Sequence, residues 1–259
     1  MSLAAAIERL DFAGPTFTPG DVWLAGAGPG GIGCLTLEVL HALSCADAVV
    51  YDALVEPAIL EAAQDAELHF VGKRGGQPST PQSEINALLV SLARSGKRVL
   101  RLKGGDPNLF GRGGEEALAL AEAGVAFRFL PGITAAFGAL AAASIPATMR
   151  GTNTAIILAT GHLAGEEDDL DWAALAATGQ PIVVYMGMSR LGRIADALMA
   201  GGTAPETPVA AIVSATTASE RIVLAELGTI AARAAQVGLA SPGLVIIGDI
   251  VAIRERLGR

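Results

Sequence analysis

The chain has 259 residues, of which 51% are hydrophobic and 17% are charged. This length and apolar content suit one large or two small globular domains and exclude intrinsic disorder. The formal net charge is −8, which argues against a nucleic-acid-binding protein that depends on a global basic field. The stretch 129–149 is uncharged, but Pro131 and Pro146 interrupt it. We therefore expect a buried loop and helix there and no membrane span.

Residues 1–20 are expected to form a flexible N-terminal tail, because prolines and a glycine precede the first apolar run. This segment lacks the long apolar core of a signal peptide. Cys34 and Cys45 lie 11 residues apart along an apparent helix, which is too far for a disulfide, so the sequence predicts a reducing, cytoplasmic environment. The three histidines lack metal-ligand spacing, and we expect no metal.

The first half of the remaining chain alternates short apolar runs with helical patterns. Strands are expected at 22–25, 48–51, 68–71, 98–102 and 126–130, and helices at 35–45, 81–95 and 115–123. Alternation with short connections predicts a mostly parallel sheet with both faces covered by helices.

The second half resumes this alternation after the uncharged stretch. Strands are expected at 155–159, 182–186, 209–213, 222–225 and 244–250, and helices at 170–177, 191–200 and 229–237. The strands on either side of the polar turn 215–220 predict a hairpin and hence a mixed sheet. The sequence thus predicts two α/β lobes, an N-terminal domain over 21–131 and a C-terminal domain over 132–259. A small-molecule active site is expected in the cleft between them.

The segment 70–112 is cationic within an acidic protein. It contains eight lysines and arginines but two acids, a balance of +6. Such a segment is typical of a site for an anionic small molecule. The alternative is that several of these residues, such as Arg94 and Lys97 beside Gly96, are solvated charges at a helix end.

The first glycine-rich loop, Gly26-Ala27-Gly28-Pro29-Gly30-Gly31, matches G-x-G-x-x-G after a strand. Asp52 ends the next strand, near where dinucleotide-binding folds place the acid that holds a ribose hydroxyl. These features alone allow a nicotinamide or flavin oxidoreductase. They also allow a tight strand-to-helix turn without any ligand.

The second glycine-rich loop follows strand 98–102 and reads Lys103-Gly104-Gly105-Asp106-Pro107. It lies where a parallel strand enters its crossover, which is the edge at which open α/β sheets bind ligands. Adjacent glycines let a ligand approach the backbone, and the carboxylate of Asp106 accepts hydrogen bonds. Dinucleotide-binding folds do not explain this loop.

At this point the sequence resembles the tetrapyrrole methylases, and within them the branch that methylates uroporphyrinogen III. The matching segments occur in the same order as in the family and span roughly residues 22–250. The most specific of them is the segment from Arg101 to Glu116. The others are the first glycine loop, Tyr51-Asp52, Val71-Gly72-Lys73-Arg74, Pro131-Gly132-Ile133-Thr134-Ala135, Ile145-Pro146, Thr160-Gly161-His162 and Tyr185-Met186-Gly187.

The resemblance implies methyl transfer from S-adenosylmethionine to C2 and C7 of uroporphyrinogen III, giving precorrin-2 through precorrin-1 in sirohaem- or cobalamin-type biosynthesis. It also implies a homodimer, S-adenosylhomocysteine as product, and no nucleic-acid or membrane partner. Carried over by position, the donor contacts are Pro29, Gly104, Gly105, Asp106, Leu109, Thr134, Ala135, Met186 and Ala215.

The resemblance assigns proton handling to Asp52 and Lys73, with Arg101 nearby, and leaves open which of the first two takes the proton. It assigns contacts with the macrocycle to Arg112, Glu115 and Arg150. Fixed cations suit this acceptor, because uroporphyrinogen carries eight carboxylates and arginine binds carboxylates with two hydrogen bonds.

The chain departs from the family pattern at three places. Gly31 replaces the usual aspartate after Gly-Pro-Gly, Met149 replaces a histidine, and Ser214 begins a segment that is commonly acidic. These changes leave two related alternatives open: a precorrin methylase acting on another ring position, or a non-catalytic protein that binds the methyl donor or a porphyrin.

Overall fold

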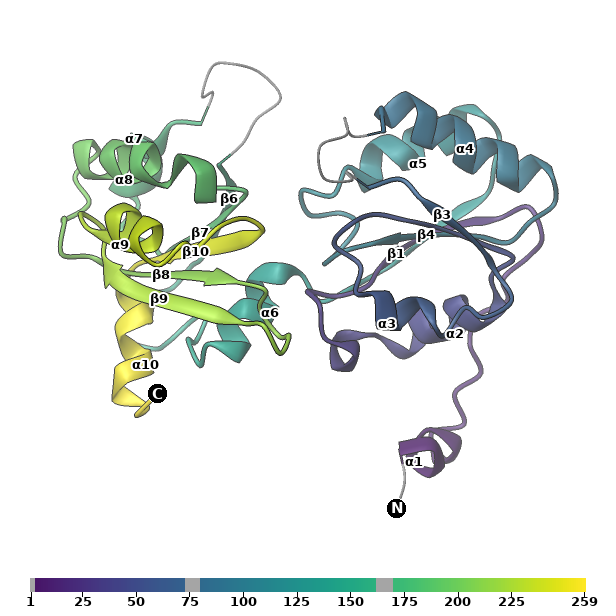
Figure 1. Ribbon diagram of the computed structural model, residues 1–259, viewed down its shortest axis with the longest axis horizontal. Coiled ribbons are helices and arrows are strands. Elements are labelled where there is room, and N and C mark those ends of the chain that lie inside the picture. Colours follow the sequence, from purple (N-terminus) through teal and green to yellow (C-terminus); the bar gives the residue numbers. More distant parts are fainter. Residues whose placement is uncertain (1–2, 73–79, 162–169) are drawn as a thin grey trace. The chain divides into compact units, whose positions relative to one another are not determined.

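The computed structural model describes residues 3–72, 80–161 and 170–259, and the chain divides into two compact units, Met1–Ile133 and Thr134–Arg259 (Figure 1). Both units are α/β, as expected from the alternating patterns. No helix in these ranges has the length and apolarity that a bilayer crossing requires.

Unit 1 is built on a five-stranded, fully parallel sheet with strand order β3-β2-β4-β1-β5. The strands are β1 (Val22–Gly26), β2 (Ala48–Tyr51), β3 (Glu67–Phe70), β4 (Val99–Lys103) and β5 (Phe127–Leu130). The helices are α1 (Leu3–Arg9), α2 (Leu37–Cys45), α3 (Pro57–Leu60), α4 (Gln82–Arg94) and α5 (Gly113–Glu122). Every residue of the central strands β1 and β4 is buried.

Helices cover both faces of this sheet, α2 and α3 one face and α4 and α5 the other (Figure 1). Alternate residues of β1 therefore enter different cores: Trp23 packs with Leu43 of α2, whereas Leu24 packs with Leu89 of α4. Burial on both faces explains why the strands read as continuous apolar runs.

Unit 2 contains a mixed sheet with order β6-β7-β10-β8-β9. The strands are β6 (Ile157–Thr160), β7 (Ile182–Tyr185), β8 (Pro208–Val213), β9 (Arg221–Glu226) and β10 (Gly243–Ile247). The helices are α6 (Ala135–Ala142), α7 (Trp172–Ala177), α8 (Leu191–Ala200), α9 (Ile230–Gln236) and α10 (Ile253–Arg256). The predicted hairpin is confirmed, because β8 and β9 pair antiparallel across the polar turn.

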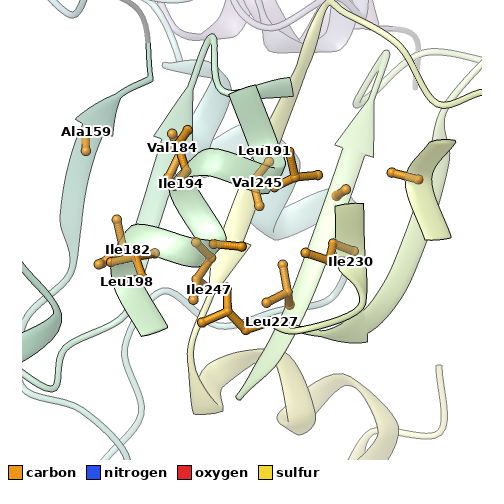
Figure 2. Packing of buried hydrophobic residues seen from close by; sticks show 14 of the residues in the cluster. Ala159, Ile182, Val184, Leu191, Ile194, Leu198, Leu227, Ile230, Val245 and Ile247 are labelled. Carbon is orange, nitrogen blue, oxygen red and sulfur yellow. The ribbon is translucent and has the colours of Figure 1, made fainter. Parts of the chain in front are cut away.

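The main core of unit 2 lies between the sheet and helices α7, α8 and α9. Figure 2 shows Ile182, Val184, Val245 and Ile247 of the strands meeting aliphatic side chains from α8 and α9. The opposite face carries Tyr185, whose hydroxyl accepts a hydrogen bond from the backbone N–H of Ala136 at the start of α6.

Three segments differ from the sequence-based expectation. The expected tail contains helix α1, and Phe17 is buried in a stack on Trp23, because an aromatic side chain there covers apolar surface. The first expected helix starts two residues later, at Leu37, since the hydroxyl of Thr36 caps it. Cys34 therefore lies in a preceding 3-10 turn. Strand β10 ends at Ile247, before the left-handed Gly248 (φ 130°).

An ion pair ties the start of β4 to the loop before β2 and makes stability depend on pH. Asp47 accepts hydrogen bonds from the backbone N–H, Nε and Nη2 of Arg98 at 2.7, 2.9 and 2.7 Å. The Arg98 hydrogen bonds lower the pKa of Asp47 from 3.8 to about 2. The stabilisation is therefore present above pH 4 and is lost as pH falls towards 2.

We expect Asp47→Asn to remove this part of the acid dependence. The side chains of Arg98 and Asp47 are 34% and 38% exposed, so solvent screens the ion pair. We therefore expect it to contribute about 1 kcal/mol or less to the free energy of unfolding. Urea unfolding at pH 7 and pH 3 measures it: the loss of unfolding free energy between these pH values should be smaller in the variant than in the parent. The exposed Asp65→Asn serves as the control, and equal losses in Asp47→Asn and the parent would refute the assignment.

Candidate functional site

The residues singled out in the N-terminal half gather at one edge of the unit 1 sheet. Because all five strands are parallel, their C-terminal ends form a single edge, here called the carboxyl edge. Asp52 follows β2, the Gly104–Asp106 loop follows β4, and Pro29 lies in the loop after β1. Strand β4 pairs directly with both β1 and β2, which makes these loops neighbours.

The two glycine-rich loops of unit 1 touch through their backbones. Gly28 and Gly105 form a bridge in which each N–H donates to the other's carbonyl, at 3.1 and 2.7 Å. A Cβ on Gly26 would lie 2.4 Å from the carbonyl oxygen of Gly105, and one on Gly132 would lie 2.2 Å from it. Glycine is thus required for three strand ends to converge at this edge.

The first glycine loop does not lead directly into a long helix. Gly28 is left-handed (φ 76°), and a Cβ there would lie 2.8 Å from that of Cys34 in a short 3-10 turn. Helix α2 begins only at Leu37, so the loop amides do not form the helix N-terminus on which dinucleotide folds seat a pyrophosphate. The structure of this loop therefore does not support the nicotinamide or flavin oxidoreductase that the glycine pattern alone allowed.

Asp106 stabilises the second glycine loop. One carboxylate oxygen accepts a hydrogen bond from the N–H of Asn108 at 2.8 Å, and the other accepts one from Gly132 at 3.0 Å. Each oxygen retains capacity for a further donor, because a carboxylate has about four acceptor positions. Asp106 is half-buried, as is Leu109 three residues later.

Beneath the carboxyl edge lies a buried charge cluster that consists of Arg101, Lys103, Glu116 and Gln82. Arg101 and Lys103 project from β4 towards α4 and α5, and Glu116 is fully buried. Its Oε1 accepts hydrogen bonds from Arg101 Nε at 3.0 Å, Lys103 Nζ at 2.9 Å and Gln82 Nε2 at 3.1 Å. Glu116 and Lys103 were not among the predicted site residues.

Arg101 links this cluster to Asp52. Its Nη2 lies 3.4 Å from Asp52 Oδ2, while Nη1 donates to the carbonyls of Val50 and Leu102. Asp52 is 26% exposed, so its carboxylate is accessible to a ligand at the carboxyl edge. Burial lowers the pKa of Lys103, and the neighbouring Arg101 cation acts in the same direction.

The two predicted macrocycle contacts in unit 1 pair with each other. Arg112 donates from Nε and Nη2 to the two carboxylate oxygens of Glu115, at 2.8 and 2.5 Å. Both side chains are more than half exposed at the start of α5, and Arg112 has a left-handed backbone (φ 59°). The hydrogen bond from Arg112 lowers the pKa of Glu115.

In unit 2 the predicted donor contacts also share one edge of the sheet. Strands β7 and β8 both run antiparallel to β10, so their C-terminal ends meet at the same edge, where Met186 and Ala215 lie. Thr134 joins this edge through a 2.6 Å hydrogen bond between its hydroxyl and that of Tyr185, and Ala135 follows it. Arg150 is exposed in a turn of unit 2.

The loops at this edge of unit 2 have unusual backbone conformations. Met186, Ser214 and Thr216 are left-handed, with φ of 52°, 50° and 68°. Met186 is also 46% exposed, which is high for a methionine at a strand end. Strained, non-glycine residues cluster at ligand sites more often than elsewhere. Of the predicted residues, Lys73 alone lies outside the described residues.

The chain belongs to the tetrapyrrole methylase family, because the family model of tetrapyrrole (corrin/porphyrin) methylases matches residues 21–231. Within this family it is similar to a uroporphyrinogen-III C-methyltransferase from Sinorhizobium sp, with 48% identity over 95% of this chain and 89% of the relative. A siroheme synthase from Chromobacterium violaceum is 46% identical over 98% of this chain. The match covers 54% of that relative, so the chain spans about half the length of the siroheme synthases it matches.

Solved structures agree with this assignment. The uroporphyrin-III C-methyl transferase from Thermus thermophilus, complexed with S-adenyl homocysteine, is 38% identical and has a TM-score of 0.79 over 90% of this chain and 99% of that chain. A cobalt precorrin-4 methyltransferase has a TM-score of 0.81 at 24% identity, over 90% of this chain and 96% of that chain, which shows the shared fold.

Proposed function

We propose that the protein transfers methyl groups from S-adenosylmethionine to C2 and C7 of uroporphyrinogen III and releases precorrin-2 and S-adenosylhomocysteine. The observation that carries this proposal is the contact between buried Arg101 and accessible Asp52 beside the Gly104–Asp106 loop. It is supported by the 48% identity to a uroporphyrinogen-III C-methyltransferase across most of both chains.

In the proposed function, the backbone of the second glycine loop and the strand-end residues of unit 2 bind the methyl donor. A sulfonium compound with an amino acid moiety needs hydrogen-bond acceptors and close backbone approach, which Gly104, Gly105 and Asp106 offer. Thr134, Ala135, Met186 and Ala215 offer a mixed polar and apolar lining at their own sheet edge. Pro29 and Leu109 complete the proposed set.

For the chemistry, the donor methyl is already a good electrophile, so the protein's main task is alignment. Holding a pyrrole carbon in line with the methyl–sulfur bond accounts for about 7–11 kcal/mol in well-oriented intramolecular models. The carbon–carbon bond forms as the methyl–sulfur bond breaks, and the cationic ring that results must lose a proton. Asp52 or Lys73 takes this proton in the proposal, and Arg101 orients Asp52.

For the acceptor, we expect Arg112→Ala to weaken binding of the polycarboxylate without slowing the chemical step. Loss of one charge-assisted contact should raise the KM for uroporphyrinogen III about tenfold and leave kcat within about twofold. Steady-state kinetics at saturating donor measures both constants. A fall in kcat with an unchanged KM would show that Arg112 acts on the transition state instead.

The decisive assay incubates the protein with S-adenosylmethionine and enzymatically generated uroporphyrinogen III, followed by mass analysis. A gain of two methyl groups is expected. Tight donor binding without methylation would favour a non-catalytic binding protein, which Gly31 suggested, and methylation of a different precorrin would favour a related methylase. A homodimer, a cytoplasmic location and the absence of a metal stay predictions.

A further inference from the structure

Glu116 has no role in the function proposed above, yet it lies at the centre of the buried charge cluster. Helix α5 supplies Glu116, β4 supplies the two cations and α4 supplies Gln82, and all three donors converge on Oε1. Its Oε2 is buried and accepts no hydrogen bond from the described residues. The free energy needed to remove these charges from water is about as large as the attraction between them once they are buried. Stabilisation of the fold therefore does not explain why the cluster is present.

The geometry of Arg101 shows what the cluster accomplishes. A guanidinium is a rigid plane with five N–H donors, so fixing one nitrogen constrains the direction of the others. Its Nε is fixed on Glu116 at 3.0 Å and its Nη1 on two backbone carbonyls at 3.3 and 3.2 Å. The remaining nitrogen, Nη2, then points towards Asp52, and this 3.4 Å contact is the longest of the set.

We propose that Glu116 is a positioning residue: it holds Arg101 from the buried side so that the guanidinium orients the carboxylate of Asp52. This inference rests on the proposed function for the role of Asp52 in proton removal. Lys103 balances the charge of Glu116, since the cluster and Asp52 together contain two cations and two carboxylates. Without Glu116, the guanidinium loses its anchor at Nε and Asp52 loses a fixed neighbour.

The test separates positioning from simple charge balance by comparing Lys103→Met with Lys103→Met/Glu116→Met. The double variant replaces a buried ion pair with apolar side chains of similar volume, a change that proteins often tolerate without loss of stability. It removes the anchor of Arg101, whereas Lys103→Met retains it. We expect kcat for methyl transfer to be about 10- to 100-fold lower in the double variant than in Lys103→Met, with the Kd for S-adenosylhomocysteine changed less than about threefold.

A second measurement reports directly on the hydrogen bond between Arg101 Nε and Glu116, and it does not require methyl transfer. The Arg101 Nε–H resonance, identified by its loss in Arg101→Lys, should exchange slowly with water in the parent protein and in Lys103→Met. In the double variant, exchange should be at least about tenfold faster. Equal exchange rates in all three proteins, or equal kcat values in the two variants, would overturn the role of Glu116. A parent protein that does not methylate uroporphyrinogen III would overturn the proposed function alone, and the exchange rates would still decide whether Glu116 anchors Arg101.

Discussion

Gly132→Ala is expected to destabilise unit 1 by about 3 kcal/mol or more, because the added side chain overpacks the point where three strand ends converge. The new Cβ would lie 2.2 Å from the carbonyl oxygen of Gly105 and 2.7 Å from the Cα of Gly26. Both are backbone atoms, so the clash cannot be relieved by a change of side-chain rotamer. Overpacking of this kind typically costs 1–3 kcal/mol, and here backbone at the ends of three strands must separate.

The control for this variant is Gly114→Ala. Gly114 lies in the first turn of α5, and nothing is within 4 Å of the position that its Cβ would take. Alanine is favoured over glycine in a helix by about 0.5–1 kcal/mol, so this variant should be as stable as the parent or more so. Urea unfolding followed by the fluorescence of buried Trp23, in a Trp172→Phe background common to all variants, measures both. Similar stabilities for the two variants would show that the strand ends can separate without cost.

Arg101→Ala is expected to give the largest effect on activity, a fall in kcat of at least about 100-fold. The substitution removes the charged donor that contacts Asp52, one of the two residues proposed to take the proton. Removal of one preorganised oxyanion-hole donor costs about 10²–10³-fold in other enzymes, and we expect a loss of similar size here. Lys103 still pairs with Glu116 in this variant, so the buried carboxylate keeps a counter-ion and the fold should persist. Binding of S-adenosylhomocysteine should change little, because the contacts proposed for the donor at the second glycine loop do not involve the Arg101 side chain.

The comparison for Arg101→Ala is Arg94→Ala, which removes an exposed arginine at the end of α4 that donates to the carbonyl of Ala123. Single-turnover methyl transfer and calorimetric titration with S-adenosylhomocysteine should show parent-like behaviour for Arg94→Ala. Parent-like turnover in Arg101→Ala would mean that Arg101 is a structural residue, and that Asp52 acts without it.

Much of the fold follows from the sequence because the buried strands are short apolar runs between turn residues. The run at 48–51 matches β2, and the alternation of strands and helices predicts the parallel sheet of unit 1. The start of α2 could not be placed in this way, because apolar residues continue back to Ile32 and only the hydroxyl of Thr36 decides where the helix begins. The burial of Phe17 depends on its stack with Trp23, which local pattern does not reveal.

Site residues that directly follow strands could be predicted from the sequence. Residues that reach the site only through the packing of one element against another could not. Asp52 and the Gly104–Asp106 loop could be placed at one edge because parallel strands end together. The choice of Glu116 as the buried partner depends on the packing of α5 against β4, and its neighbour Glu115 is exposed. The alternation of Arg101 and Lys103 with Leu100 and Leu102 was an available signal, since two cations in a strand buried on both faces require an acid nearby.

In the proposed function, the Gly104–Asp106 loop binds the methyl donor beside Asp52. Crystals grown with S-adenosylhomocysteine test it most directly. We expect a bound ligand with polar contacts to the backbone or carboxylate of residues 104–106 and with its sulfur on the side of the loop that faces Asp52. A ligand bound away from this loop, or NAD bound there in its place, would show that the loop is not the site of the methyl donor.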